Sequence, residues 1–335
     1  MNINIINRKQ YISVIFLFFL FFLITITITP LIGSVQIDLG NAFSRDLAFN
    51  DNVDANILFL ARIPRIILAA LTGAALSVAG AILQSLLRND LAAPFTLGVS
   101  SGAALGAVIA ISLGLPYSIA GIPTIPIAAF LGSLGAISLV FSLARTRTGD
   151  FPTPVLLLAG VTANFFFAAL VMLIHYLSDF TQSFRIVRWL MGGLDITSYK
   201  TLLSISPMIF IGFAVLIFYG RDFNVMSTGI QSAMSRGVEV IKVQKIGFIM
   251  ASLLTGTVVS LSGPIGFVGL IVPHIVRLIV GPDLRILLPA SIFFGASFLI
   301  ICDTLARTLI APTEIPVGII TAMLGGPFFV WLLKR

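Results

Sequence analysis

Residues 62–103 read RIPRIILAALTGAALSVAGAILQSLLRNDLAAPFTLGVSSGA, and this stretch decides the fold class. No charged residue lies between Arg65 and Arg88. A helix of about 20 apolar residues is long enough to cross the hydrocarbon core of a bilayer, which is about 30 Å thick. A backbone in lipid must satisfy its own hydrogen bonds, which favours a helix. The stretch therefore predicts a transmembrane helix over 65–87.

The rest of the chain has the same character. Of its 335 residues, 58% are hydrophobic and 10% are charged, whereas a soluble domain averages about 45–50% apolar and about 25% charged residues. This composition indicates an integral membrane protein and excludes a soluble globular, disordered or collagen-like chain. Cys302 is the only cysteine, which excludes an intramolecular disulfide. The net charge of +7 fits Lys- and Arg-rich cytoplasmic loops better than nucleic-acid binding.

Ten apolar segments, bounded by charges and by Pro/Gly clusters, are predicted as helices of one domain. They are 12–32, 65–87, 95–114, 118–143, 153–177, 201–219, 246–262, 268–280, 286–305 and 316–333. The first is longer than the apolar core of a signal peptide, so we expect it to be retained; a cleaved signal is the alternative. The eighth is too short to cross alone and is flanked by Gly and Pro, which is typical of a broken helix that lines a cavity.

Loop charges predict the orientation. With a cytoplasmic N-terminus, thirteen of the Lys and Arg residues fall on the cytoplasmic side and seven on the other. We therefore expect both termini in the cytoplasm. Residues 35–61 are expected to form an external loop. The short amphipathic segment 221–241 is either a solvated cytoplasmic loop or a docking helix for a cytoplasmic partner.

Motifs for catalysis by this chain are weak or missing. No G-x-x-x-x-G-K-[ST] loop occurs, so a partner would have to hydrolyse any ATP used. The letters GVSSG at 98–102 match a nucleophile elbow, but they open an apolar helix instead of following a strand. Glycines recur every four residues from Gly98 to Gly106, which favours close helix packing. An intramembrane enzyme that uses Ser100 or His175 is the minor alternative.

Ionisable residues within the spans are few. The sequence has no Cys/His cluster, so no metal site is expected. Asp303 and Glu314 lie near predicted helix ends, which weakens the alternative of an ion-coupled secondary transporter without excluding it. His274 follows Pro273, and we expect it to bond backbone groups that the broken helix leaves free; a proton relay is the other interpretation.

Three arginines lie at the predicted outer ends of spans. Arg62 and Arg65 bracket Pro64, and Arg307 follows the ninth span. Snorkelling to lipid headgroups is the simpler interpretation. The other is a docking patch for an acidic partner, because Arg pairs with carboxylates through two parallel hydrogen bonds.

Three long stretches resemble the FecCD family of permeases. They are residues 62–103, quoted above, residues 263–291 (GPIGFVGLIVPHIVRLIVGPDLRILLPAS) and residues 303–335 (DTLARTLIAPTEIPVGIITAMLGGPFFVWLLKR). They match the family's GPIxFxGLxxPHxxR, E-[IL]-P-V-G and G-x-P-F-F elements in order. The family comprises permease subunits of type II ABC importers for iron–siderophore complexes, haem and vitamin B12.

The resemblance implies an all-α integral membrane fold of about ten helices, similar to the vitamin B12 importer permease, in a single domain over 1–335. It also implies a second permease subunit, identical or not, two ABC ATPase subunits and an extracytoplasmic substrate-binding protein. ATP hydrolysis would occur on the ATPases, and no cofactor or metal is implied. Ferric siderophore is the expected cargo, with haem and cobalamin as alternatives. The expected location is the bacterial inner membrane.

Site residues follow from the same motifs. By resemblance, Arg62, Arg65 and Arg307 dock the binding protein. The ATPase-coupling positions are Gly229, Gln231, Ala233, Arg236 and Gly237 within 221–241. Structural or gating positions are Pro94, Gly98, Gly102, Thr146, Pro152, Gly263, Pro264, Pro273, His274, Arg277, Pro316 and Gly318. The chain departs from the family where Glu often follows the first coupling glycine and Leu often precedes the second: it has Ile230 and Arg236 there.

Overall fold

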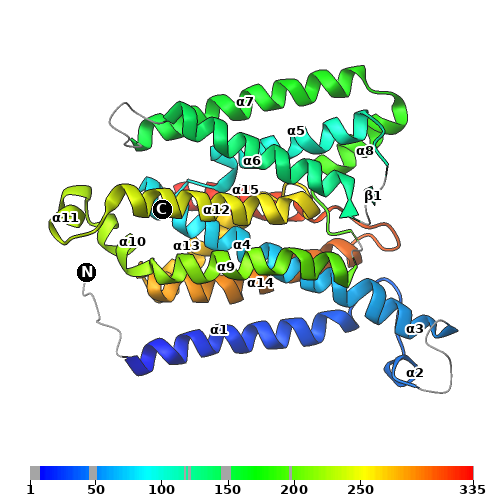
Figure 1. Ribbon diagram of the computed structural model, residues 1–335. Coiled ribbons are helices and arrows are strands. Elements are labelled where there is room, and N and C mark those ends of the chain that lie inside the picture. Colours follow the sequence, from blue (N-terminus) through cyan, green and yellow to red (C-terminus); the bar gives the residue numbers. More distant parts are fainter. Residues whose placement is uncertain are drawn as a thin grey trace.

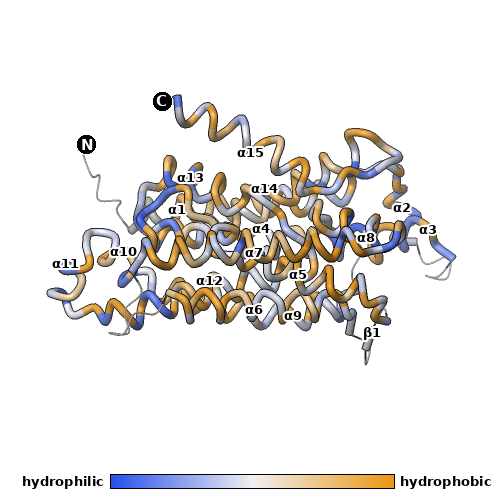
Figure 2. The backbone as a smooth tube through the Cα atoms, turned by 90° about the horizontal axis from the view of Figure 1, so that it is seen from above, coloured by the Kyte–Doolittle hydropathy of each residue, from blue (hydrophilic) through white to orange (hydrophobic). Residues whose placement is uncertain are grey.

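The long helices of the protein lie side by side along one axis (Figure 1). The computed structural model describes residues 8–44, 51–116, 118–119, 122–144, 152–195 and 198–334. Hydrophilic residues gather toward the two ends of the bundle, and its middle is apolar (Figure 2). This distribution is the one expected of a chain whose central band lies in lipid.

Every one of the ten predicted spans corresponds to a helix. The helices are α1 (Arg8–Ile28), α4 (Ile63–Leu87), α5 (Val99–Ser112), α6 (Thr124–Ala144), α7 (Thr153–Leu177), α9 (Tyr199–Phe218), α12 (Val240–Ser262), α13 (Val268–Val280), α14 (Leu284–Thr308) and α15 (Val317–Leu333). Among the described residues, seven helices are long and apolar enough to cross a membrane, and α5, α13 and α15 are shorter apolar helices. The predicted short eighth span, 268–280, coincides with α13.

Helix α4 forms the centre of the bundle. Its side chains are buried without interruption from Thr72 to Gln84. A Cβ atom on Gly73 would lie 2.1 Å from the carbonyl oxygen of Gly295 in α14, and one on Gly80 would lie 1.9 Å from that of Gly269 in α13. The backbones of three helices therefore touch, as small residues permit where membrane helices pack closely.

The predicted external loop over 35–61 is wrong for residues 53–61. Short helix α2 (Leu39–Ala42) is followed by α3 (Val53–Asn56) and by a π-helical turn, Ile57–Arg62, that runs directly into α4. Charges and Pro64 indicated a boundary, but proline is tolerated here. In the π register the Pro64 nitrogen would face the carbonyl of Phe59, and the hydroxyl of Tyr199 donates to that carbonyl instead, at 2.6 Å.

Several shorter elements connect the long helices. They are the 3₁₀ turns Thr29–Leu31 and Pro94–Leu97, the paired strands β1 (Ser118–Ile119) and β2 (Ile122–Pro123), and the helices α8 (Phe180–Leu190), α10 (Gly220–Ser227) and α11 (Ile230–Ser235). The spans did not predict α8, although Asp179 and Gln182 form a capping box at its start. That D-x-x-Q pattern before an amphipathic run was the available signal.

The beginning of α1 and the end of α15 lie at the same end of the bundle as α10 and α11 (Figure 1). We call this the inner end, and the end that carries α2, α3 and α8 the outer end. A chain that crosses the membrane an even number of times, as the ten predicted spans imply, must have both termini at the same end. Which end faces the cytoplasm stays a prediction from the loop charges.

The glycines of the GVSSG helix pack against other helices. A Cβ atom on Gly102 would lie 2.6 Å from the carbonyl oxygen of Gly132 in α6, and one on Gly106 would lie 2.1 Å from that of Ala128. The packing interpretation is confirmed for these two glycines. The buried hydroxyl of Ser100 has no hydrogen-bond partner among the described residues, so the Ser–base contact that a nucleophile needs is not formed there.

Candidate functional site

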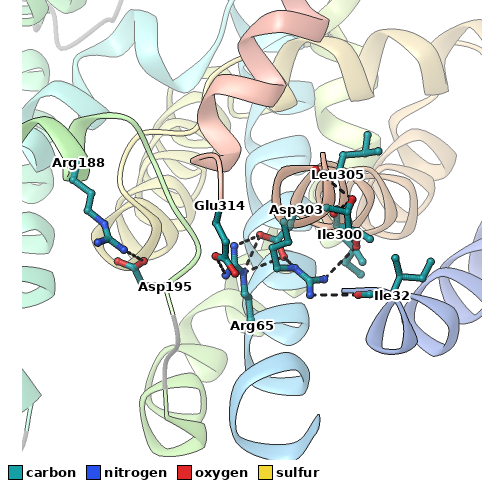
Figure 3. Close-up of polar contacts among 11 residues, drawn as sticks. Ile32, Arg65, Arg188, Asp195, Ile300, Asp303, Leu305 and Glu314 are labelled. Carbon is teal, nitrogen blue, oxygen red and sulfur yellow. Dashed lines mark hydrogen bonds and ion pairs between the residues drawn. The ribbon is translucent and has the colours of Figure 1, made fainter. Parts of the chain in front are cut away.

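Five charged residues from the π-helical turn before α4, from α4, from α14 and from the segment before α15 meet at the outer end. We call them the outer arginine cluster: Arg62, Arg65, Asp303, Arg307 and Glu314. The Arg65 Nε atom lies 3.0 and 3.1 Å from the two carboxylate oxygens of Asp303, and its Nη2 atom lies 2.9 Å from Oδ1. Its Nη1 atom lies 2.6 Å from Oε2 of Glu314 (Figure 3). The sequence offered no sign of these pairs, because their members lie far apart in the chain.

Asp303 joins two arginines. The Arg307 Nε atom lies 3.1 Å from its Oδ2 atom. The Asp303 side chain is 1% exposed. A buried carboxylate persists only where it is paired and hydrogen-bonded, and here two guanidinium groups supply both.

Arg62 bonds to the backbone that follows α1. Its Nη1 atom donates to the carbonyl of Pro30 at 2.7 Å, and its Nη2 atom donates to that of Val35. Arg307 also reaches this segment, since its Nη1 atom lies 3.5 Å from the carbonyl oxygen of Ile32. Arg62 and Arg307 are buried, so in this conformation they tie α1 to the bundle. A docking role for the three arginines stays a prediction.

A second polar group lies near the inner end and involves Pro273. Proline has no N–H, so the Gly269 carbonyl in α13 has no partner four residues on. The Gln84 Nε2 atom donates to it at 3.1 Å from α4. The Gln84 Oε1 atom accepts from Arg277 at 2.8 Å, and Arg277 pairs with Asp90 at 2.5 Å.

The expectation that His274 bonds the freed backbone is therefore wrong, because Gln84 occupies that position. Among the described residues the Nε2 atom of His274 has no hydrogen-bond partner. The imidazole instead lies edge-on to Phe328 of α15, with ring centroids 5.7 Å apart.

Four of the predicted structural residues belong to a junction of three backbones at the C-terminal ends of α8 and α12 and the N-terminal end of α15. The Gly318 N–H donates to the Gly192 carbonyl at 3.1 Å, and the Gly193 N–H donates to that of Ser262 at 2.8 Å. Cβ atoms on Gly318 and Gly263 would lie 2.2 and 2.5 Å from carbonyl oxygens at the end of α8. The other two members are the neighbouring Pro264 and Pro316. Side chains are excluded here, so we call this the glycine junction.

The remaining predicted positions are dispersed. Pro94 begins the 3₁₀ turn that precedes α5, Gly98 follows it with a φ of +75°, and Pro152 immediately precedes α7. Thr146 lies outside the described residues. Within the described ranges no three His, Cys, Asp or Glu side chains come together in a way that could hold a metal ion.

The segment 221–241 folds into two short helices at the inner end. Gly229 separates α10 from α11 with a φ of +140°. After α11, Gly237 adopts a φ of +79°. Its N–H donates to Met234, and the Val238 N–H donates to Ala233, both at 3.0 Å. These two hydrogen bonds together form a Schellman motif, which requires a left-handed backbone conformation at the glycine.

The two faces of α11 differ in their exposure. Ala233 is fully buried, whereas Ile230, Gln231, Met234 and Arg236 are exposed. An open groove of about 620 Å³ lies beside Met234, between α11 and the first two turns of α12. Exposed apolar side chains four residues apart beside a groove are suited to contact with a partner protein at the inner end.

A residue that disfavours the left-handed backbone region at position 237 should weaken coupling. Nothing lies within 4 Å of a Cβ atom there, so the cost is backbone strain alone, about 1–2 kcal/mol. We expect Gly237→Leu to lower the cargo moved per ATP hydrolysed about fivefold or more in proteoliposomes. Gly237→Asn, which tolerates the left-handed region, is the matched control. Unchanged coupling in the leucine variant would contradict a coupling role.

Helix α10 is attached at both sides. The Arg88 Nη2 atom donates to the Met226 carbonyl at 2.8 Å, so the cation lies at the negative C-terminal end of α10. The Asn224 Nδ2 atom donates to Asp283 at 2.6 Å, and Asn224 Oδ1 accepts from the Leu284 N–H at 2.8 Å. Movement of the α10–α11 pair would therefore be passed to α4 and α14 together.

Asp283 makes this attachment sensitive to pH. Burial alone raises the pKa of its carboxyl, but hydrogen bonds from Arg285 and Asn224 outweigh burial and hold the pKa below its usual range. A carboxylate with a lowered folded-state pKa stabilises the fold above its unfolded pKa of about 3.9. That contribution is lost as the pH falls through the folded-state value.

We therefore expect Asp283→Asn to lower thermal stability at pH 7 by up to about 1 kcal/mol. The difference from wild type should shrink as the pH falls toward 3. Thermal melts of detergent-solubilised protein across this range measure it, with Asp222→Asn in the first turn of α10 as control. A difference that does not depend on pH would contradict the assignment.

The chain matches known permeases along most of its length. The FecCD transport family model covers residues 19–335. The chain is 44% identical over 277 residues to the cobalamin import system permease protein BtuC of Halobacterium salinarum, covering 82% of this chain and 72% of that protein. It is 38% identical over 318 residues to the hemin transport system permease protein HmuU of Yersinia pestis, covering 94% of each.

The fold is likewise shared. A solved structure described as an inward-facing conformation of a metal-chelate type ABC transporter superposes with a TM-score of 0.82. It is 31% identical and covers 97% of this chain and 99% of its own. The all-α permease fold predicted from the sequence is confirmed, and the chain belongs to the FecCD transport family.

Proposed function

We propose that this chain forms the translocation pathway of an ATP-driven importer for ferric siderophores, with a second permease subunit, two ATPases and a binding protein. As a FecCD member it is a permease of the ABC importer class. The observation that carries the proposal is the central position of α4. Its outer end holds Arg65 of the arginine cluster, and Arg88 at its inner end bonds the helix that leads into α11.

Each partner would use a different surface. The ATPase would receive α11, and the binding protein would dock over the outer arginine cluster, with both termini in the cytoplasm of a bacterial cell. Exposed apolar side chains of α7, such as Leu158, Phe165 and Met172, offer a face for the second permease. The mechanism is alternation between outward- and inward-open states, driven by movement of the α10–α11 pair.

An ion-coupled secondary transporter is less well supported. Such a carrier needs an intramembrane carboxylate or histidine that changes its protonation. Asp303 is instead bonded to two arginines. The relatives' names favour one further possibility, an importer of the same class that carries haem or cobalamin.

Cargo uptake tests the proposal. A strain without this gene is given labelled ferric siderophores, haem and cobalamin side by side, and is then complemented with the wild-type chain. We expect selective loss of ferric siderophore uptake and recovery on complementation. Loss of haem or cobalamin uptake alone would overturn the cargo and leave the importer. Uptake that persists after ionophore treatment but stops on ATP depletion separates the importer from a secondary transporter.

A further inference from the structure

The two carboxylates that bind Arg65 differ in accessibility. The Asp303 side chain is 1% exposed and the Glu314 side chain is 47% exposed, while Arg65 between them is 11% exposed. Glu314 is the most exposed of the five charged residues in the outer arginine cluster. Arg65 therefore has one buried partner and one half-exposed partner, and it contacts both carboxylates (Figure 3).

The two ion pairs also differ in how readily they break. Removing a buried partner leaves an uncompensated charge, which is strongly unfavourable. An exposed pair contributes little, because water and salt replace either member at small cost. A third carboxylate that approaches from outside would displace Glu314 and leave Asp303 in place.

Glu314 lies in the short connection that joins α14 to α15. The connection runs from Leu309 to Pro316 between α14 and α15, and the Ile315 N–H donates to the Ala306 carbonyl at 3.0 Å. Four residues after Glu314, Gly318 enters the glycine junction at the start of α15. The Arg65–Glu314 pair is thus a direct tie between α4 and the segment that leads into α15.

We propose that Glu314 is an internal competitor of the docking partner. An Asp or Glu side chain of the substrate-binding protein would take its place on the Nη1 side of Arg65, by exchange of carboxylates at one guanidinium. This inference rests on the proposed docking at the cluster. The exchange sets how tightly the binding protein is held, and it releases the tie between α4 and the start of α15 only when a partner is present.

A change in net charge would affect docking differently from an exchange of carboxylates at Arg65. Neutralising any outer-end carboxylate raises the local positive charge and attracts an acidic partner weakly at long range. Exchange requires a carboxylate in contact with Arg65. The chain offers a matched control, because Asp195 at the outer end is exposed, pairs with exposed Arg188 at 3.4 Å, and is not a hydrogen-bonding or ion-pair partner of Arg65.

The experiment measures docking of the importer's own substrate-binding protein, purified without cargo, to the assembled transporter in lipid nanodiscs. Glu314→Gln is expected to lower the Kd about two- to fivefold, as loss of one exposed competing ion pair predicts. Asp195→Asn should change it by less than this. Arg65→Gln should raise the Kd about tenfold or more by removing the charge that both carboxylates share. Size-exclusion chromatography of each variant is the control for folding.

Two outcomes separate the inference from the proposed docking site. An unchanged Kd in Arg65→Gln overturns docking at the cluster. A raised Kd in Arg65→Gln, together with equal effects of Glu314→Gln and Asp195→Asn, overturns the exchange and keeps the docking site. A conservative Arg65→Lys variant, which keeps the charge but not the planar fork, should lie between wild type and Arg65→Gln. Hydrogen exchange of residues 309–316 should rise on docking in wild type and already be raised in Glu314→Gln.

Discussion

Gly80→Val is expected to prevent assembly of the helix bundle. A Cβ atom at this position would lie 1.9 Å from the carbonyl oxygen of Gly269 and 2.7 Å from its Cα atom. Backbone cannot move aside as a flexible side chain does, so α4 and α13 would have to separate. Separation would also break the Gln84 bond to Gly269. The cost is about 3 kcal/mol or more, at the upper end of overpacking effects.

Yield of monodisperse protein after detergent extraction and its melting temperature measure this effect. Gly135→Val is the matched control, because Gly135 also lies within a membrane helix, α6, and has no atom within 4 Å of an added Cβ. Normal yield and stability of Gly80→Val would show that the α4–α13 contact is not as close as described. A loss in Gly135→Val as great as in Gly80→Val would point to helix propensity instead.

Asp303→Ala should have the second large effect. It leaves Arg65 and Arg307 without their shared carboxylate, in surroundings where both side chains are nearly buried. Breaking a buried ionic group by removing one partner costs about 3–5 kcal/mol. The thermal melt of the purified permease should shift accordingly, and cargo uptake should fall with it.

Two comparisons make the Asp303 result specific. Asp195→Ala removes an exposed carboxylate at the same end and should cost no more than about 1 kcal/mol. Replacing Arg65, Asp303 and Arg307 together by Met, Leu and Met should recover part of the stability, because the one carboxylate that loses its partner, Glu314, is half-exposed and no buried charge is left unpaired. Docking should stay lost in the triple variant. A mild effect of Asp303→Ala would mean that water reaches the cluster.

The spans could be predicted from the sequence because a segment that crosses lipid must be an apolar helix, and an apolar run is visible in the sequence. Segments such as 153–177 and 268–280 agree with α7 and α13 to the residue. The helical start at Val53 was not predictable from boundaries drawn at charges. Arg62 and Pro64 indicate an end, whereas Pro64 lies in the first turn of α4, and the hydroxyl of the distant Tyr199 bonds the Phe59 carbonyl before it.

The site was predictable in its residue types and not in its pairings. Arg65, Arg307 and Asp303 are visible in the sequence as charges near helix ends. That one carboxylate holds both arginines depends on the packing of α4 on α14, which the sequence of either helix does not show. Gln84 was missed for a similar reason, because its partner is a backbone carbonyl that becomes available only through Pro273.

The bond from Gln84 to the Gly269 carbonyl has a consequence for how this permease can change during evolution. Loss of Pro273 restores an N–H to α13 that can bond the Gly269 carbonyl, so the Gln84 amide is no longer needed as its donor. Loss of Gln84 while Pro273 is present leaves a buried carbonyl unpaired, which costs about 1–3 kcal/mol. The two substitutions are therefore tolerated in one order and opposed in the other. We therefore expect relatives that keep Pro273 to keep a side-chain donor at position 84 on α4 as well.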